Sequence, residues 1–585
     1  MSELPPPLPP DDETVTDNLN VDQDNRGTMR ALIEAFVSLF IAVLLFRTFA
    51  AEGYMISTGS MAPCLLGYHK RVVCPTCGTT FPFGTAYDTD DDPESNRVMA
   101  SRSRAVCPNC GQHGIDVSDV PRNHGDQLLV NKQAYLYQSP RRWDIIVFRN
   151  PARPTEAYVK RLVGLPGEQI QIVGGDVYVD GKIARKSYAQ QLATRILVHD
   201  HSHLPHNDDG FQTHWEAAPA NQGSGSGDRI HSGWEAIGNV FQFKGGDVRR
   251  PDKEPVDWVE YHHWIRSGGQ HDTSVHLDHW PADVSTASVP PSGLRFDSKT
   301  GEFSVTGALP ASAARQLLDL TDDVAFRNAV LDLYQASHVV NVSDAYGYNP
   351  SDEVGSSNPV RDLLFSANVV IEGGSGEFVI ELTNGAMIYH IVFDYVRREV
   401  SLFEEPLPQG LALNSEPTGT EWKSDPVTIA SWPKAVSKKG GKFEVSLFDK
   451  QVLVAMDGQV VMPPWQFDYS STFQPSRIPV RFGARGLDVK VDQLKLYRDI
   501  YYTDSRSRHA VTRPLELKQD QFFVLGDNSP VSHDSRRWNS PVVHRSHLIG
   551  KPFLVHLPSK PGNLRIGKRE LQLRIPDWER IRFLR

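Results

Sequence analysis

The sequence predicts a mainly β protein with a single N-terminal transmembrane helix. Residues 117–187 and 360–500 contain short runs rich in Val, Ile, Tyr and Phe, which alternate with polar residues and are separated by Gly and Pro. This pattern is typical of β-strands joined by tight turns. The only stretch apolar enough to cross a bilayer is 31–51, which matches the length of about 20 residues that a spanning helix needs.

Length and composition exclude several classes of protein. The chain has 585 residues, which at about 150 residues per domain suggests three to four domains. With 61 Lys and Arg against 71 Asp and Glu, the net charge is −10, which argues against a nucleic-acid partner. Apolar residues make up 39% and charged residues 23%, as in folded proteins. Five cysteines are too few for a disulfide-stapled scaffold of this size.

The N-terminus is expected to be an anchor rather than a cleaved signal peptide. Residues 1–28 are acidic and Pro-rich and predict a disordered tail, and 29–51 predict the transmembrane helix. A signal peptide would begin with a basic segment, whereas the first 30 residues carry seven acids against Arg26 and Arg30. The basic residues alone leave the orientation open, because Arg47 directly follows the apolar run.

Changes in pattern divide the remaining chain into six segments. Residues 188–359 predict a loop-rich insertion with a helical stretch over 311–340, and 360–500 a two-sheet β-sandwich made of eight strand-like runs. The other segments are 52–70, 71–116, 117–187 and 501–585.

Three short segments contain the candidate chemistry. Residues 55–63 read MISTGSMAP and include Ser60, while 158–167 read YVKRLVGLPG and include Lys160. A serine needs a base to become a nucleophile, and a lysine can be that base if burial lowers its pKa. On an alternating strand Lys160 would point into an apolar pocket and Arg161 outward. No Gly-x-Ser-x-Gly occurs, which disfavours an α/β-hydrolase, and taken singly either residue is most simply a surface residue.

The third segment, 526–536, reads GDNSPVSHDSR and follows a predicted strand. By itself such a segment is also compatible with a purely structural turn. Together the three segments resemble the type I signal peptidases, membrane-anchored Ser-Lys endopeptidases that remove signal peptides. The motifs follow one another in the order typical of this family. They are one span, Ser-Met-x-Pro, Gly-Asp-x-x-x-Val, Lys-Arg-x-x-Gly-Leu-Pro-Gly, and Gly-Asp-Asn with Ser-x-Asp-Ser-Arg. The resemblance covers roughly 29–70, 120–187 and 515–558.

The resemblance implies a signal-peptidase-type β catalytic core in three parts, 52–70 with the nucleophile, 117–187 with the general base, and 501–585. Ser60 is then the nucleophile and Lys160 the general base. The backbone N–H of Ser60 and the hydroxyl of Thr58 would form the oxyanion hole.

The same resemblance assigns supporting roles in the last segment. Ser532 would orient the lysine amine, and Asp534 and Arg536 would form the ion pair that holds the final loop. Two positions depart from the family pattern, which usually has Pro where Ser57 stands and often Thr where Cys64 stands. Both departures concern the shape of the loop rather than the dyad.

Substrates and location follow from the resemblance as well. The enzyme would cleave signal-peptide-bearing preproteins after Ala-x-Ala-like sequences, bound as an extended strand, at the secretion translocon. It would lie in the cytoplasmic (inner) membrane as a single-pass protein in contact with lipid, with an extracytoplasmic catalytic domain. No cofactor is expected for catalysis.

Residues 71–116 predict a zinc-ribbon-like insertion. Two Cys-x-x-Cys-Gly knuckles, separated by 29 residues, offer four thiolates for a structural zinc ion: Cys74, Cys77, Cys107 and Cys110. Disulfides are the alternative, since an extracytoplasmic compartment permits them. A second metal-ligand cluster, His199, Asp200, His201, His203 and His206, is also considered, although loop histidines are more often solvated.

The sandwich over 360–500 resembles the concanavalin-like and laminin-G-like folds, which implies a glycan or protein ligand. This leaves an alternative function, a catalytically inactive membrane-anchored binding protein. A self-cleaving Ser-Lys repressor is disfavoured, because the acidic N-terminus offers no DNA-binding helix-turn-helix.

Overall fold

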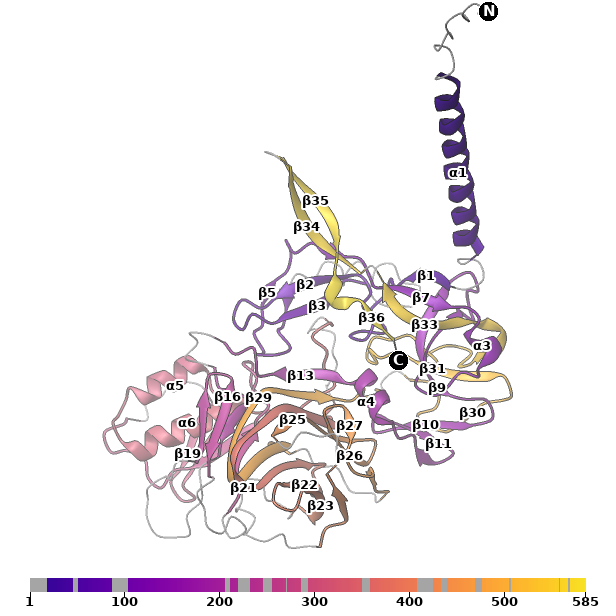
Figure 1. Ribbon diagram of the computed structural model, residues 1–585. Helices are drawn as coiled ribbons and strands as arrows, with labels where there is room; N and C mark the ends of the chain where they lie inside the picture. Colours follow the sequence, from indigo (N-terminus) through magenta and orange to yellow (C-terminus); the bar gives the residue numbers. More distant parts are fainter. Residues whose placement is uncertain are drawn as a thin grey trace, which may run out of the picture.

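The computed structural model confirms a mainly β protein (Figure 1). It describes residues 18–45, 51–86, 104–205, 211–218, 232–245, 255–269, 271–285, 293–349, 358–407, 425–432, 439–468, 476–503, 507–556, 558–566 and 569–584. The helices and the two short 3₁₀ turns within these residues are α1 (Asn18–Leu45), α3 (Ala134–Tyr137), α4 (Tyr188–Thr194), α5 (Ala311–Leu318), α6 (Val324–His338), η5 (Arg545–His547) and η6 (Trp578–Arg580).

The sheet that carries the candidate catalytic residues is assembled from distant parts of the chain. Its strand order is β1-β7-β33-β8-β9-β31-β32, and β36 pairs with β33. The strands are β1 (Ala51–Met55), β7 (Gln127–Asn131), β8 (Ile145–Arg149), β9 (Ala157–Gly164), β31 (Gln521–Leu525), β32 (Val543–His544), β33 (Leu548–His556) and β36 (Arg582–Phe583). Strands from both sides of the long insertion therefore interleave in this core sheet.

A smaller sheet follows β9 and contains the predicted tight turns. Its order is β12-β11-β10-β30, with β10 (Gln169–Val173), β11 (Asp176–Val179), β12 (Lys182–Ile183) and β30 (Leu515–Glu516). Asp180 and Gly181 have φ of 51° and 77° between β11 and β12, the two positive values that a two-residue hairpin turn requires.

A 14-stranded sheet forms most of the insertion. The strands on its main path are β14 (Trp215–Ala217), β17 (Asp257–Tyr261), β29 (Val480–Arg498), β21 (Leu363–Thr383), β22 (Met387–Asp394), β23 (Glu399–Pro406) and β24 (Thr428–Ser431). The strands off this path are β13 (Ile196–Asp200), β15 (Trp234–Ile237), β16 (Val240–Lys244), β25 (Gly440–Phe448), β26 (Gln451–Met456), β27 (Gln459–Val460) and β28 (Trp465–Gln466).

This large sheet differs from the predicted pair of separate sheets over 360–500. The long strands β21 and β29 run through both halves of the sheet. Their register shifts, for instance between Ile371 and Gly373, mark irregularities where strands bend. Phe393 of β22 and Phe443 of β25 lie across one core with ring centroids 4.7 Å apart. The two halves of this one continuous sheet therefore face each other.

The prediction of a loop-rich segment over 188–359 is wrong in its first half. The strands β13, β14, β16 and β17 belong to the large sheet, and buried aromatic residues such as Trp215 and Phe241 fill its core. Burial here depends on scattered aromatic residues rather than on an aliphatic alternation, so the strand pattern is weak in the sequence. The predicted helical stretch over 311–340 is confirmed as α5 and α6, which pack on a sheet of β18 (Asp272–His276), β20 (Glu302–Thr306) and β19 (Leu294–Asp297).

Short ribbons surround the core sheet. A three-stranded sheet, β3-β2-β6, and the pair β4-β5 enclose the cysteine knuckles, and the hairpin β34-β35 extends away from the body (Figure 1). Their bounds are β2 (His69–Val73), β3 (Thr80–Gly84), β4 (Arg104–Ala105), β5 (Ile115–Asp116), β6 (Arg122–Asn123), β34 (Ser559–Ile566) and β35 (Arg569–Pro576).

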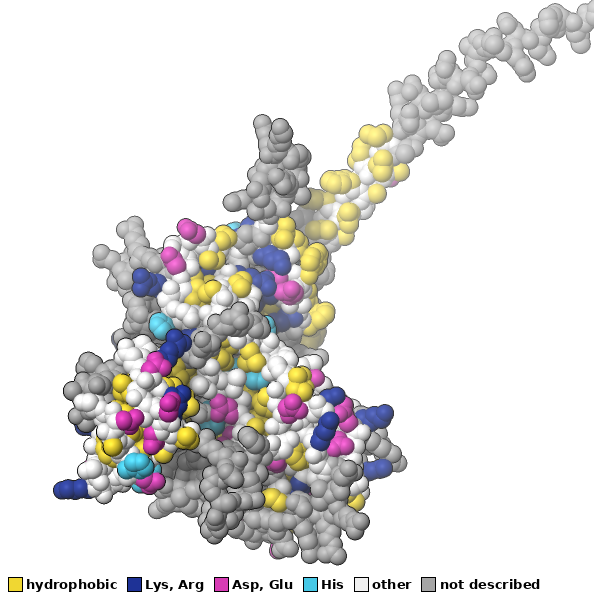
Figure 2. All heavy atoms as spheres, turned by 90° about the vertical axis from the view of Figure 1, so that its left-hand side faces the viewer, with side chains coloured by type: hydrophobic (Ala, Val, Ile, Leu, Met, Phe, Trp, Pro, Cys, Tyr) yellow, Lys and Arg dark blue, Asp and Glu magenta, His cyan; other side chains and the backbone are white. Residues whose placement is uncertain are grey.

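The N-terminal helix α1 departs from the sequence prediction. It begins at Asn18, within the segment predicted as a disordered tail, and residues 1–17 and 46–50 lie outside the described part. Among the described helices none is long and apolar enough to cross a membrane, so the predicted transmembrane helix over 29–51 is not confirmed. The large apolar side chains between residues 29 and 43 are exposed along α1, which projects from the body (Figure 2).

Candidate active site

Ser60 and Lys160 lie together in the core. Lys160 Nζ is 2.5 Å from Ser60 Oγ, although 100 positions separate the residues in the sequence. Ser60 is 3% and Lys160 1% exposed. Lys160 Nζ also lies 5.6 Å from the centre of the Tyr158 ring. A lysine that is buried beside a serine hydroxyl, away from water, can exchange a proton with that hydroxyl.

The position of Lys160 follows from strand β9. This strand pairs with β8 on one side, where Lys160 is opposite Ile146, and with β31 on the other. From Lys160 to Gly164 every residue is buried, because both faces of this central part of the sheet are covered. The expectation that Arg161 points outward is therefore wrong: Arg161 is 1% exposed and pairs with Asp527 at 2.5 Å.

The loop that carries Ser60 is fixed at its base by Asp126. The Asp126 carboxylate accepts the N–H of Leu66 at 2.9 Å, and the Asp126 carbonyl accepts the N–H of Ile56 at the same distance. Gly125 allows this approach, since a Cβ there would lie 1.7 Å from the Ile56 carbonyl oxygen. The Gly-Asp pair of the Gly-Asp-x-x-x-Val motif thus ties both ends of the nucleophile loop to β7.

Thr58 lies two residues before Ser60 in the same loop and is half-buried. The two predicted oxyanion-hole donors, the Thr58 hydroxyl and the Ser60 N–H, thus belong to one short loop. An oxyanion hole needs two such donors beside the nucleophile.

Ser532 is brought to the site, but its hydroxyl does not take the expected partner. Its Oγ is completely buried and has no hydrogen-bond partner in the described part of the protein. The side chain lies against Gly526, where a Cβ would be 2.2 Å from Ser532 Oγ and 2.6 Å from the Ser60 carbonyl oxygen. Ser532 is therefore close to the nucleophile while its hydroxyl remains unpaired.

Asp534 and Arg536 form a buried ion pair beneath this loop. Arg536 Nη2 lies 2.8 Å from Asp534 Oδ2, and both side chains are fully buried. Asp534 also accepts the N–H of Gly526 at 3.0 Å. Burial alone would raise the pKa of Asp534, but the charge and hydrogen bonds of Arg536 outweigh it and lower this pKa to about 2. The carboxylate therefore stays charged and holds the loop in place.

Asn528 is a site residue whose role the sequence did not indicate. Its backbone N–H donates to the Ser60 carbonyl at 2.9 Å, and its side-chain Nδ2 donates to the Gly59 carbonyl at 3.0 Å. The Gly-Asp-Asn motif was the available signal, but only the structure reveals that its asparagine holds the backbone of the nucleophile loop.

The chain is similar to known proteins over two of its parts. The family described as "Signal peptidase, peptidase S26" matches residues 119–223 and 453–557, which include Lys160, Ser532, Asp534 and Arg536 but not Ser60. Over these two ranges the chain is similar to the peptidase S26 family of signal peptidases. Outside the matched ranges lie the nucleophile loop, the cysteine knuckles and much of the insertion.

Curated signal peptidases are similar to part of the chain. Signal peptidase I of Rickettsia typhi is 44% identical over 165 residues, 28% of this chain and 48% of that protein. Signal peptidase I of Leptolyngbya laminosa is 42% identical over 73 residues, 11% of this chain and 36% of that protein. The chain thus spans less than half the length of these relatives. Among solved structures, Trypanosoma rangeli sialidase matches at 18% identity over 24% of this chain and 21% of that one, with a TM-score of 0.14 that supports no conclusion.

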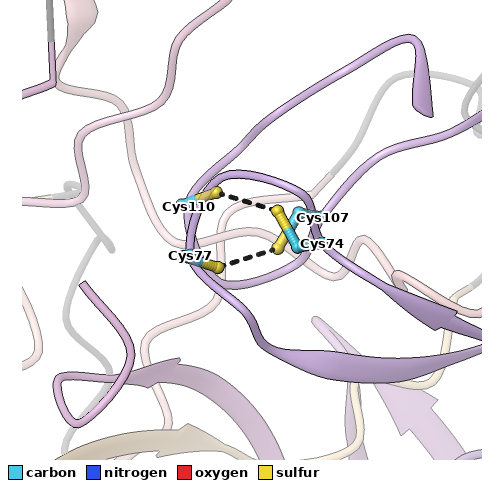
Figure 3. Close-up of side chains that lie close together, drawn as sticks. All are labelled: Cys74, Cys77, Cys107 and Cys110. Atoms are coloured by element: carbon cyan, nitrogen blue, oxygen red, sulfur yellow. Dashed lines mark hydrogen bonds between the residues drawn. The ribbon is translucent and has the colours of Figure 1, made fainter. Parts of the chain in front are cut away.

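The four cysteine thiols of the knuckles converge (Figure 3). Their Sγ atoms all lie within 4.8 Å of one another, with Cys74 and Cys110 3.6 Å apart and Cys77 and Cys107 3.7 Å apart. A tetrahedral zinc ion with Zn–S bonds of about 2.3 Å places sulfur atoms about 3.8 Å apart. The distances fit such a site, whereas a disulfide requires about 2.05 Å.

The histidines of the second predicted cluster do not form a comparable site. His199 and His201 are buried rather than solvated, and His206 lies outside the described residues. His199 stacks on His214 with ring centroids 4.0 Å apart, and burial lowers the pKa of His199 to about 3 and of His201 to about 4. Within the described residues, the groups with metal-ligand spacing contain no histidine.

A cluster of carboxylates joins the core to the insertion. Asp176 and Asp449 belong to it, and the Lys186 ammonium lies 2.8 Å from Asp449 and 2.7 Å from Asp499. Arg361 pairs with Asp176 at 2.6 Å. The cations of the protein itself thus compensate these acids, and the cluster connects the two parts of the chain.

Proposed function

We propose that the protein is a membrane-anchored serine endopeptidase that removes N-terminal signal peptides from exported proteins. The observation that supports this most directly is the distance of 2.5 Å between Lys160 Nζ and Ser60 Oγ in a buried site. The family match supports the same activity. A serine hydroxyl next to a buried amine is one of the accepted arrangements for nucleophilic catalysis.

The chemistry needs only residues of this chain. The neutral amine of Lys160 takes the proton of Ser60 Oγ as this oxygen attacks the scissile carbonyl carbon. The resulting oxyanion accepts hydrogen bonds from the Ser60 N–H and the Thr58 hydroxyl, and such bonds stabilise charge that develops only in the transition state. Lys160 then gives its proton to the leaving amine, which leaves an acyl-enzyme.

Hydrolysis of the acyl-enzyme repeats these steps with water. Lys160 removes a proton from the water, the hydroxide attacks the ester carbonyl, and the proton returns to Ser60 as the new carboxyl terminus leaves. The buried and unpaired hydroxyl of Ser532 is suited to hold the lysine amine during this exchange, since it has no other hydrogen-bond partner among the described residues. Asp534 and Arg536 hold the loop on which Ser532 lies.

The substrate part of the proposal rests on the family resemblance. A preprotein would lie as an extended strand beside the nucleophile loop, with small residues in an Ala-x-Ala-like order before the cleaved bond. The substrate would emerge from the secretion translocon on the outer side of the cytoplasmic membrane, where the catalytic domain would lie.

The test is cleavage of a peptide with an Ala-x-Ala site by the detergent-solubilised protein. We expect Ser60→Ala and Lys160→Ala to lower the rate at least about 10³-fold, because each removes one half of the dyad. Lys551→Ala is the matched control, since Lys551 is a lysine of the same sheet that pairs with Asp144. Cleavage by Lys160→Ala at the wild-type rate would contradict the proposal.

We also propose that α1 anchors the protein in the membrane. Nine large apolar side chains between residues 29 and 43 are exposed. An apolar surface of this extent is typical of a segment that is in contact with a membrane or with another protein. The protein should remain in the membrane fraction after an alkaline wash, and a chain that lacks residues 1–50 should be released. Release of the full-length protein would contradict the anchor.

The four cysteines of the knuckles are proposed to hold structural zinc. A Cys₄ site leaves no coordination position open, so the ion would stabilise the ribbon and take no part in the peptidase reaction.

A further inference from the structure

A short segment of the insertion, residues 344–349, reaches the catalytic loops. It lies outside both ranges that match the peptidase family. Arg498, at the end of β29, holds its first part: the guanidinium donates to the carbonyls of Asp344 at 3.1 Å and Ala345 at 3.0 Å. The same guanidinium lies 4.5 Å from the centre of the Tyr346 ring. The large sheet thus supports a segment that leads into the active site.

Two side chains of this segment bind the Gly-Asp-Asn loop. The hydroxyl of Tyr346 donates to the Asp527 carbonyl at 2.6 Å. The amides of Asn349 and Asn528 donate to each other, with 2.8 Å for both hydrogen bonds. Asn349 is 6% and Asn528 0% exposed, so water does not compete for these bonds.

Asn528 connects Asn349 to the nucleophile loop through further hydrogen bonds. As described above, its side-chain amide donates to the Gly59 carbonyl and its backbone N–H to the Ser60 carbonyl. The hydrogen bond to Gly59 depends on the side-chain rotamer of Asn528, and Asn349 selects this rotamer by accepting from Nδ2 and donating to Oδ1.

Tyr348 adds a steric restraint in the same place. Its ring lies over Gly59, where a Cβ would be 2.3 Å from the ring carbon Cε1. The Tyr348 carbonyl accepts the N–H of Gly84 at 2.8 Å, which joins the segment to the cysteine-bearing ribbon as well.

We propose that Asn349 and Tyr346 are positioning residues through which the insertion sets the geometry of the Ser60 nucleophile. This inference rests on the proposed peptidase function. The insertion is then part of the active-site framework and not only an attached binding domain. Positioning of a nucleophile to within a fraction of an ångström governs the catalytic rate far more than substrate affinity, because a displacement of 1 Å costs roughly 10²-fold.

The experiment compares kcat and KM for peptide cleavage by Asn349→Ala and Tyr346→Phe. We expect Asn349→Ala to lower kcat about tenfold with KM changed by less than about twofold, and Tyr346→Phe to have a smaller effect in the same direction. Asn384→Ala is the control, because Asn384 is a buried asparagine of the same insertion that caps the turn at Ala386 and Met387. It should lower stability and leave kcat unchanged.

Hydrogen exchange gives a readout that does not depend on activity. The Asn528 N–H bonds the Ser60 carbonyl, so Asn349→Ala should speed exchange at Asn528, and Asn384→Ala should not. An unchanged kcat in Asn349→Ala, equal losses in Asn349→Ala and Asn384→Ala, or unchanged exchange at Asn528 would each overturn the inference. A wild-type protein that cleaves no peptide would refute the peptidase function, and the exchange result would then decide the coupling alone.

Discussion

Arg161 Nη2 and Asp527 Oδ2 lie 2.5 Å apart in the interior of the protein, and each residue is 1% exposed. Arg161 directly follows Lys160, and Asp527 directly precedes Asn528. The pair therefore locks the strand of the proposed base to the loop that holds the nucleophile. Arg161 also donates to the Trp143 carbonyl at 2.8 Å, which fixes the guanidinium on a third segment.

The first prediction concerns this ion pair. Asp527→Asn should destabilise the fold by about 3–5 kcal/mol, because it leaves the Arg161 charge buried without its counter-ion. Lys551→Ala breaks a pair in which the lysine is 35% exposed, and should cost about 1 kcal/mol or less. Urea unfolding at neutral pH measures both changes. Equal losses in the two variants would show that burial of the Arg161 pair has no energetic consequence.

The second prediction concerns Gly59. Gly59→Ala should abolish most peptide cleavage, because the new methyl group would overlap the Tyr348 ring and displace the residue before the nucleophile. Gly53→Ala is the matched control in β1, where the nearest atom to a Cβ is 3.6 Å away. Rates should be compared with thermal unfolding of each variant. Wild-type cleavage by Gly59→Ala would show that the loop can move without loss of function.

The sequence was informative about the catalytic core where residues have local signatures. The alternation of β9 predicted the strand that carries Lys160, and ordered motifs predicted which distant segments meet. The alternating pattern gave a wrong prediction for the side chain of Arg161, because both faces of β9 are covered there. A charged residue can be buried in such a place when it pairs with an acid such as Asp527. That pairing joins positions 366 residues apart and leaves no periodic trace.

The insertion was harder to predict for a different physical reason. The core of its large sheet contains Trp215, Phe241 and similar aromatic residues that lie on short strands. The hydrophobic periodicity of the sequence is therefore weak. The contact between Asn349 and Asn528 depends on the relative placement of two folded parts. Two asparagines in turn-like segments give no sequence signal for such a contact, because asparagine is common in turns.

The third prediction is a loss of stability in mild acid. Burial lowers the pKa of His201, His262 and His263 to about 4 and of His199 to about 3, whereas unfolded histidines titrate near 6.5. Unfolding therefore takes up protons below pH 6.5, so stability is highest above this pH and falls as the pH drops towards 4. Each group contributes up to roughly 3 kcal/mol at the acid end.

Urea unfolding between pH 7.5 and 4.5 tests this dependence. His201→Gln should reduce the slope of stability against pH, because one proton fewer is taken up on unfolding. His276→Gln is the matched control, since the His276 side chain is 70% exposed. A slope that is the same in both variants would exclude His201 as a contributor.

The fourth prediction concerns the metal. The purified protein should contain zinc bound through the knuckles, and a strong chelator should lower the unfolding temperature, because a structural metal contributes its binding free energy to folding. Cys77→Ser should lose the metal, whereas Cys64→Ser should retain it, since Cys64 lies outside the cysteine group. A reducing agent without chelator should change nothing, because the four sulfur atoms are too far apart for disulfides. The opposite result, with sensitivity to the reductant and none to the chelator, would replace zinc by two disulfides.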